Sequence, residues 1–248
     1  MKLSHAVIGS CALGMILIAP AANAAFSVGA SAAVEMYPYK GIDTDVRPFP
    51  MINYDGDRFY VRGIGAGVYL WKDASDQVSL DAYYSPLRFR PNKSDDHQMK
   101  QLDKRRATVM GGATYRHIAS WGTIRTSVSA DMLDNNDGFR ADGAYFYPVN
   151  LGDWKLTPGI GMSWNSSDFN DYYYGVSGHE ARRSGMRQYS ASSSWSPYAE
   201  LTANYKLASN WNTFVSGRYT QLDNEIKDSP MVNQSYSALF VTGVNYSF

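Results

Sequence analysis

The sequence predicts an all-β fold, a single antiparallel transmembrane β-barrel, and three observations lead to that prediction. The last thirteen residues, Tyr236 to Phe248, alternate between an apolar, aromatic face and a small, mostly polar face, and they end on an aromatic residue. No stretch after residue 24 approaches the run of about 20 apolar residues that a membrane helix requires. Aromatic residues nevertheless make up 14% of the chain. Strands with one side toward lipid and one toward a polar lumen account for this combination.

The first 24 residues are typical of a secretory signal peptide. Lys2 precedes an apolar run from Ala6 to Pro20, and Ala22-Asn23-Ala24 forms a small-residue cleavage site. We therefore predict a signal peptide over residues 1–24, a barrel over residues 25–248, and export to the outer membrane with cleavage. The only cysteine, Cys11, lies inside the apolar run, so the exported chain would have no thiol for disulfides, catalysis or metal binding.

Alternating segments continue along the chain and are joined by two kinds of connection. Five connections are short turns, and we expect them, with both termini, on the periplasmic side: Asp55 to Asp57, Asp73 to Asp76, Ser120 to Gly122, Leu151 to Asp153, and Ala208 to Asn210. The other connections are longer and should lie outside; the longest, Ser166 to Ser194, is predicted to be irregular.

The stretch from Arg58 to Trp71 decides the strand count. It carries Gly63, Gly65 and Gly67, which fit either one kinked strand or two short strands with a tight bend. If the turns on both sides of it lie on the same side of the membrane, the stretch must cross and return, which gives about 12 strands. A ten-stranded barrel with an irregular hairpin in this place is the alternative. Ala25 to Tyr37 alternates like the last strand, and the two could close the barrel.

Several segments resemble the MltA-interacting protein family, also called the MipA/OmpV family. The most specific is Asn-Asp-Tyr-Tyr-Tyr-Gly-Val-Ser at 170–177, followed by Glu180-Ala181. The others are Asn53 to Tyr60, Gly152 to Pro158, Asp228 to Val232, and the terminal Tyr246-Ser247-Phe248. The resemblance covers the whole exported chain.

The resemblance implies a non-enzymatic outer-membrane scaffold. Its expected partners are a membrane-bound lytic transglycosylase and a bifunctional penicillin-binding peptidoglycan synthase, which it would join during murein enlargement and division. Two other functions stay open at this point, a narrow channel or uptake barrel for small molecules and a surface adhesin. Outer-membrane lipid and the barrel assembly machinery are expected partners of any such barrel.

Three groups of residues are candidate sites. In the longest loop, Tyr172, Tyr173 and Tyr174 with Glu180 could form a recognition platform or a plug over the barrel mouth. Val244, Tyr246 and Phe248 resemble the carboxy-terminal signal that the barrel assembly machinery recognises. The third group consists of charged residues on the predicted lumen face, which could fill the interior as a paired network or select ions in a pore: Glu35, Arg106, Arg116, Arg125, Asp131, Glu200 and Arg218.

The sequence gives no pattern typical of an enzyme, a metal site or a cofactor site. The histidines after residue 24 are His97, His117 and His179, and no two of them have the spacing of a two-histidine metal motif. Basic and acidic residues number 23 each. We therefore predict no catalytic residues, no cofactor and no nucleic-acid partner.

Overall fold

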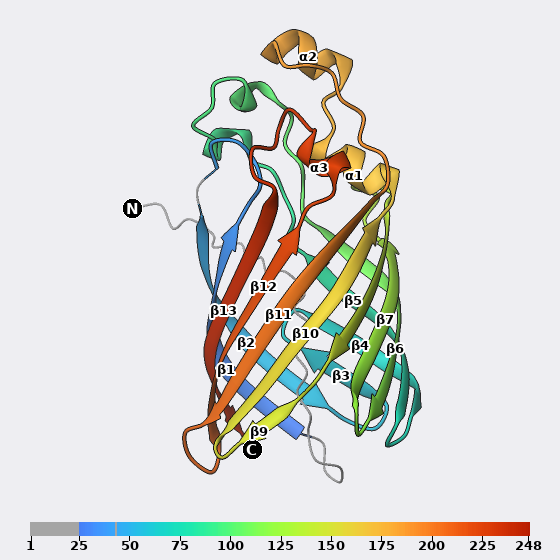
Figure 1. Cartoon of the computed structure of the whole chain (residues 1–248), viewed down its shortest axis with the longest axis vertical. Coiled ribbons are helices and arrows are strands. Elements are labelled where there is room, and N and C mark those ends of the chain that lie inside the picture. The colour runs from blue at the N-terminus through green and yellow to red at the C-terminus, as the bar shows by residue number, and fades with distance from the viewer. Residues whose placement is uncertain (1–24, 43) are drawn as a thin grey trace.

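Twelve antiparallel strands form a closed ring in the computed structural model, which describes residues 25–42 and 44–248. The predicted signal peptide, residues 1–24, lies outside the described residues. The ring is shown in Figure 1, and each strand pairs with the next, β13 pairing back to β1. The ring strands are β1 (Ala25–Met36), β2 (Asp45–Asp55), β3 (Phe59–Arg62), β4 (Gly65–Lys72), β5 (Asp76–Ser85), β6 (Thr108–Ala119), β7 (Gly122–Asp131), β8 (Phe139–Phe146), β10 (Trp154–Asn165), β11 (Ser194–Lys206), β12 (Trp211–Gln221) and β13 (Tyr236–Ser247).

One further short strand, β9 (Val149–Leu151), continues the line of β8 and pairs with β10. The sequence predicts a single strand from Phe139 to Val149. The structure divides it at Tyr147 and Pro148, because proline has no N–H to donate to the neighbouring strand.

The stretch from Arg58 to Trp71 crosses and returns, so the prediction of 12 ring strands is confirmed and the ten-stranded alternative is wrong. Its two strands are short: β3 has four residues and β4 has eight. They are joined by a two-residue turn at Gly63 and Ile64, in which Gly63 has a φ of +57°. Such tight hairpin turns require a positive φ, which glycine adopts without steric cost.

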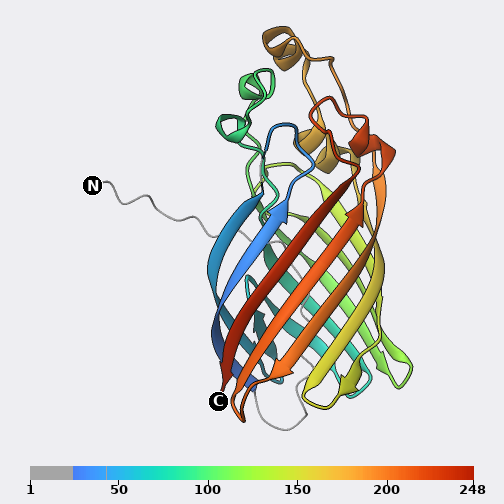
Figure 2. The same ribbon diagram turned by 60° about the vertical axis from the view of Figure 1, so that its left-hand side comes forward.

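The two ends of the barrel differ. The five predicted short turns all lie at one end, the turn end, together with Ala25 and Phe248 (Figure 2). Closure there is completed by a hydrogen bond of 3.1 Å from Phe248 N to Phe26 O. The longer connections and all helices lie at the opposite end, the loop end. Which end faces the periplasm stays a prediction.

The outward and inward faces alternate along the strands as predicted. On β13, Phe240 is 47% exposed on the outer face, whereas its neighbours Leu239 and Val241 are buried inside. The tryptophans lie near the strand ends and form two belts. Trp71, Trp121, Trp154 and Trp211 lie at the turn end, and Trp164 and Trp195 pair at the loop end. This is the distribution of interfacial aromatic residues.

The predicted irregular segment at 166–194 contains two helices, α1 (Ser167–Tyr174) and α2 (Gly178–Ser184), so that expectation is wrong. Local signals explain both starts, because Ser166 caps α1 and Ser177 forms a capping box with Glu180 at α2. The other long loops contain η1 (Pro91–Lys93), η2 (Met99–Gln101) and α3 (Asn224–Lys227). None of the helices in the described part of the chain has the length and apolarity needed to span a membrane.

Candidate functional site

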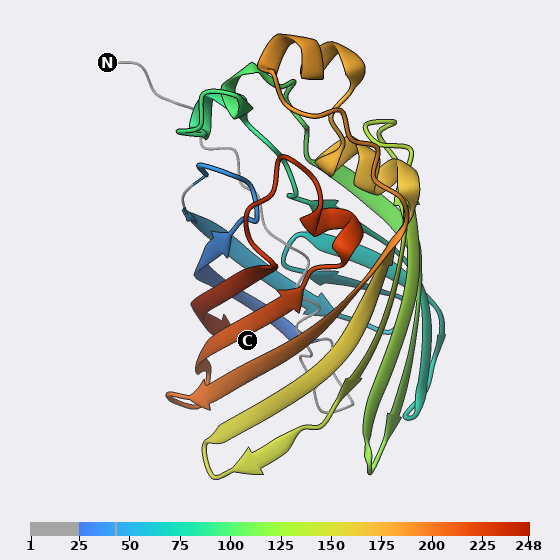
Figure 3. The ribbon, with the colours of Figure 1, turned by 45° about the horizontal axis from the view of Figure 1, so that its top comes forward.

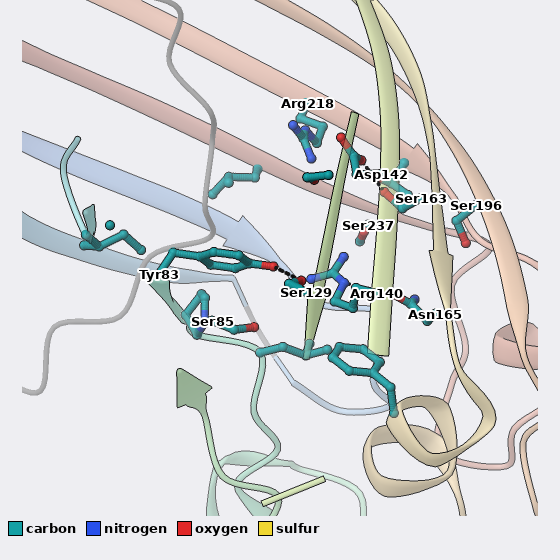
Figure 4. Close-up of a pocket in the computed structure, with 18 of the residues that line it drawn as sticks. Tyr83, Ser85, Ser129, Arg140, Asp142, Ser163, Asn165, Ser196, Arg218 and Ser237 are labelled. Carbon is teal, nitrogen blue, oxygen red and sulfur yellow. Dashed lines mark hydrogen bonds between the residues drawn. The ribbon is translucent and has the colours of Figure 1, made fainter. Parts of the chain in front are cut away.

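A cavity of about 310 Å³ occupies the lumen beneath the loop end. Its lining includes five arginines, Arg62, Arg116, Arg125, Arg140 and Arg218, and three carboxylates, Glu35, Asp81 and Asp142. Phe169, Tyr174 and Ile226 from the loops close it at the top. Figure 4 shows Asp142 beside Ser163 and near Arg218, and Arg140 beside Ser129 and Tyr83. The described lining therefore carries more positive than negative charge.

Most of these charges are held in ion pairs across neighbouring strands. Arg218 Nη2 lies 2.6 Å from Glu200 Oε2, between β12 and β11. Arg125 Nη2 lies 3.0 Å from Asp142 Oδ1, between β7 and β8. Asp142 also accepts hydrogen bonds from Ser163 Oγ at 2.9 Å and from Tyr198 Oη at 3.0 Å. Separating such a pair would leave a buried charge without its partner, which is costly. The pairs therefore hold the side chains of the interior in place.

Arg116 differs from the other lumen arginines. It lies directly opposite Arg125 in the β6–β7 register and is only 7% exposed. Within residues 25–42 and 44–248, no ion pair or hydrogen bond joins its guanidinium to another side chain. Arg140, by contrast, donates to Asn165 Oδ1 at 2.9 Å and lies 5.1 Å from the ring of Phe169. Arg116 is thus a buried cation that faces the cavity without a described counter-ion.

Of the predicted lumen residues, one lies in a loop and one lies at the very end of its strand. Arg106 is exposed in the loop before β6, because that strand begins only at Thr108. Asp131 ends β7, where its carboxylate accepts backbone hydrogen bonds from Leu133, Asn135 and Asn136. It therefore organises a turn at the loop end. Arg106 lies outside the strand because alternation alone does not show that β6 begins at Thr108, whereas Asp131 is the last residue of β7.

The remaining predicted lumen residues lie inside the barrel. Glu35 is at the loop end of β1, where it accepts from Tyr37 Oη at 2.6 Å and lies 3.6 Å from Arg47. Sequence reasoning missed Asp142 on β8, whose carboxylate bonds to side chains on three other strands, β7, β10 and β11. The signal that could have found it is the alternation of β8, in which Arg140 and Asp142 alternate with Phe139 and Ala141.

The loop end is closed by a cap, which we define as residues 37–42, 86–107, 166–193 and 222–235. Its buried centre brings together apolar residues from all four segments: Tyr39, Phe89, Met99, Tyr173, Val176 and Met231 among them. Figure 3 shows these segments gathered at the loop end above the strands. Burial of this many large side chains gives the cap a hydrophobic core of its own.

The loop tyrosines connect the segments of the cap. Tyr173 is fully buried; its hydroxyl donates to Arg106 O at 3.0 Å, and Tyr39 Oη donates to Tyr173 O at 3.2 Å. Tyr174 is 5% exposed, and Ser229 Oγ donates to its carbonyl at 2.6 Å. Tyr172 is half-buried and accepts from Arg106 N at 2.8 Å. This geometry is that of a plug and leaves only Tyr172 partly accessible to a partner.

Glu180 fixes α2 to the rest of the cap. Its Oε1 accepts from Asp103 N and Arg105 Nη2, both at 2.8 Å, and its Oε2 accepts from Ser177 N and Ser177 Oγ, both at 2.9 Å. Burial acts to raise the pKa of Glu180, but these backbone hydrogen bonds and Arg105 outweigh it and hold the pKa below the ordinary value. We call the contacts of Glu180 with Asp103 and Arg105 the latch.

The turn end presents short turns and an exposed aromatic rim. Phe248 is 75% exposed and stacks on Phe26 with ring centroids 5.3 Å apart. Tyr246 packs edge-on against Phe248 at 4.9 Å, and Val244 is exposed on the same outer face. The predicted assembly signal therefore forms one continuous outward stripe. No group of three or more His, Cys, Asp or Glu residues that could hold a metal ion occurs in the described residues.

Comparison with known proteins gives a consistent family match. The family model described as MltA-interacting protein MipA matches residues 28–248. The MltA-interacting protein of Escherichia coli K12 is 48% identical over 96% of this chain and 97% of its own length. The putative outer membrane protein YiaT of the same organism is 41% identical, covering 93% and 94%. The outer membrane protein OmpV of Vibrio cholerae is 29% identical, covering 79% and 76%.

Solved structures that resemble the chain are outer-membrane barrels of low sequence identity. The NanC porin aligns with a TM-score of 0.44 and 10% identity, over 91% of this chain and all of that one. The COG4313 outer membrane channel of Pseudomonas putida F1 aligns with a TM-score of 0.45 and 10% identity, covering 92% and 97%.

Proposed function

Because this chain belongs to the MltA-interacting protein family, we propose that it is a non-enzymatic scaffold that joins MltA, a lytic transglycosylase, to a bifunctional penicillin-binding peptidoglycan synthase. Relatives in the family carry the name outer membrane protein, and this chain is an outer-membrane barrel. The observation that carries the proposal is 48% identity, over nearly the full length of both chains, to a protein named for its interaction with MltA.

The geometry of the barrel suggests where such partners would bind. The cap buries its aromatic residues in its own core, so the loop end offers few apolar anchors to a partner. The turn end instead exposes Trp71, Leu151 and Phe248, at 61%, 56% and 75%. An interface of ordinary size, about 800 Å² per partner, would need several turns and the adjoining outer wall. A partner anchored in the same membrane could reach both.

Capture of partners from detergent-solubilised envelopes tests the scaffold, with the folded barrel as bait. Asp57 and Asp153 are exposed in two turns at the turn end, and the double variant Asp57→Lys with Asp153→Lys reverses charge there. The matched control, Asp95→Lys with Asp168→Lys, makes the same change at exposed loop-end positions. We expect the wild-type bait and the control to recover MltA and the synthase, and the turn variant to recover less of both.

Heat-modifiable migration of each bait shows that its barrel is folded. Failure of the folded wild-type bait to recover either enzyme would refute the scaffold. Equal loss of recovery with the loop-end control would place the interface elsewhere than at the turn end.

The lumen cavity favours a narrow channel as a second candidate function. The charged side chains that line the cavity are compatible with the passage of ions. Because the cap closes the loop end, conduction would require the cap to open. Planar-bilayer recording compares the wild type with Glu180→Gln, which weakens the latch. A channel gated by the cap should conduct more in the variant, and zero conductance in both would exclude it.

A further inference from the structure

On one of its two sides, β2 pairs with a neighbouring strand over only part of its length. Its ladder with β1 runs through eleven residue pairs, from Ala25↔Asp55 to Glu35↔Asp45. Its ladder with β3 has only three, at Asn53, Tyr54 and Asp55. One more backbone bond, from Gly63 N to Ile52 O at 3.0 Å, ends the pairing. Among residues 25–42 and 44–248, no strand pairs with β2 on this side from Asp45 to Met51, and the barrel wall that they form is interrupted there.

The turn at Gly63 and Ile64 is the cause of the interruption. It reverses the chain after only four residues of β3, so the β3–β4 hairpin stops about halfway along β2. On its other side the hairpin reaches almost to the end of β5, where Gly65 pairs with Tyr83 and Tyr84 N donates to Ile64 O at 3.1 Å. The opening thus lies between β2 and the hairpin tip. Arg88 in the following loop bounds it above, 3.6 Å from Asp45.

The sequence of β2 is adapted to an open edge. Ile52 O points toward β3, and residues of the same parity direct their backbone groups to the same side. Pro48 and Pro50 have this parity, so the unpaired edge lacks two of the N–H groups that another strand would have. Prolines are confined to such edges and prevent pairing with a further strand. The opening is therefore built into the sequence of β2.

The edge lies at membrane depth, and the lumen cavity reaches the hairpin tip on the other side of the interruption. Val46 and Ile52 are 60% and 48% exposed on the outer face, as expected for residues toward lipid. The cavity lining includes Ile64 at the hairpin tip and the outward-facing Ala66 on β4. Unpaired backbone carbonyls in hydrocarbon each cost several kcal/mol, and such edges persist only where they line a polar cavity. The cavity therefore reaches the interruption from the hairpin side.

The interior beside the opening has one apolar and one cationic side. Inward-facing Phe49, Met51, Leu239 and Val241 form a buried apolar patch with Ala33 and Phe214, and Leu239 also lines the cavity. On the β6 side lies Arg116, buried and without a described counter-ion. An occupant complementary to both surfaces has a negatively charged head and an apolar chain.

We propose that the interruption beside β2 is a lateral opening through which the barrel takes an anionic, single-chain amphiphile from the surrounding bilayer. Arg116 is the counter-ion of its head, and the apolar lining residues Leu239 and Ile64 pack against its chain. The inference is independent of the scaffold function, because it concerns the lumen and the wall, not the turn end.

Binding is tested with dodecanoate and the full chain, purified from outer membranes and placed in nanodiscs of zwitterionic phosphatidylcholine. Equilibrium dialysis compares the wild type, Arg116→Gln and the exposed-site control Arg183→Gln with empty nanodiscs. We expect saturable binding of about one dodecanoate per barrel, weakened at least tenfold in Arg116→Gln and unchanged in Arg183→Gln. Neither dodecanol, which lacks the charge, nor acetate, which lacks the chain, should compete. Equal binding by wild type and Arg116→Gln, or no saturable binding, would overturn the proposal.

A second measurement tests the opening itself. Since the sole cysteine lies within residues 1–24, a substituted cysteine would be the only thiol of the exported chain. Ile64→Cys is compared with Val128→Cys, whose site is 60% exposed on the uninterrupted outer wall. A charged, membrane-impermeant methanethiosulfonate should modify only the Ile64 variant, and dodecanoate should slow that reaction. No reaction at Ile64 would show that the wall is closed there, and equal reaction at both sites would show that access to Ile64 does not depend on an opening.

Discussion

The latch at Glu180 provides a quantitative test of how the cap is held. Replacing Glu180 by Gln removes the negative charge that pairs with Arg105, whose side chain is 9% exposed against 3% for Glu180. One of the two former carboxylate positions becomes an NH2 group, which faces donors and cannot accept from them. Leaving one member of a buried ion pair costs about 3 to 5 kcal/mol. We take the lower value, because Gln retains one acceptor.

Hydrogen exchange of cap amides measures this loss. Ala181 N donates to Ser177 O at 2.8 Å and Gly185 N donates to Ala181 O at 2.9 Å, so both amides report on α2. A loss of about 3 kcal/mol lowers their protection roughly 100-fold, since each 1.4 kcal/mol is a factor of ten. Amides of the β6–β7 ladder should not change, because the strands do not depend on the latch.

The matched control is Arg183→Gln. Arg183 lies 2.7 Å from Asp103, but the two side chains are 38% and 59% exposed, so this pair contributes at most about 1 kcal/mol. Its effect on the same amides should be less than tenfold. If Glu180→Gln and Arg183→Gln change the protection of Ala181 equally, the buried latch is not what holds α2 in place.

Four further predictions follow from the same geometry. The protection of α2 should be constant above the ordinary Glu pKa of 4.5 and fall as the pH drops through the lowered pKa of Glu180, a dependence that exchange between pH 6 and pH 3 should find absent in Glu180→Gln. Gly63→Val should destabilise the barrel by about 1 to 2 kcal/mol in urea titrations, because Gly63 has a positive φ, whereas the same change at Gly143, which has open space around its Cβ position, should cost less. Glu200→Gln should lower stability by about 3 kcal/mol in the same assay, by leaving Arg218 without its closest carboxylate. Phe248→Ala should reduce the amount of assembled barrel in cells but not the yield of refolding in detergent, and an equal loss in both would argue against a signal read by the assembly machinery.

The strands could be predicted from the sequence because each depends on local alternation. Residues 236–248 show the period of two without help from any other segment, and the turn at 55–57 is marked by Asp-Gly-Asp. The short hairpin at Arg58 to Trp71 is also predictable, because the turns before and after it can lie at the same end of the barrel only if the stretch crosses and returns. The ends of the strands are harder to predict: alternation suggests that Arg106 faces the lumen, because it does not show where pairing stops.

The contacts of the site depend on positions that alternation does not determine. The pair of Arg218 with Glu200 requires the register between β11 and β12, and the bond from Tyr198 to Asp142 spans strands that are not adjacent. The cap is harder still, because Tyr173 is buried by four loops that meet only after the barrel closes. A capping-box signal at Ser177 and Glu180 was present in the sequence, yet it predicts only the start of a helix and not its docking.

The cap and the interrupted wall have a joint consequence for access to the lumen. A buried aromatic core and the latch hold the loop end closed, so a solute entering from that side must first separate four packed segments. The opening beside β2 requires no such change, because Pro48 and Pro50 and the early turn at Gly63 maintain it in the folded state. Of these two routes into the cavity, the one from the membrane therefore costs less than the one from the water above the cap. A ligand that follows it must be soluble in the bilayer and must also match the positive charge at Arg116.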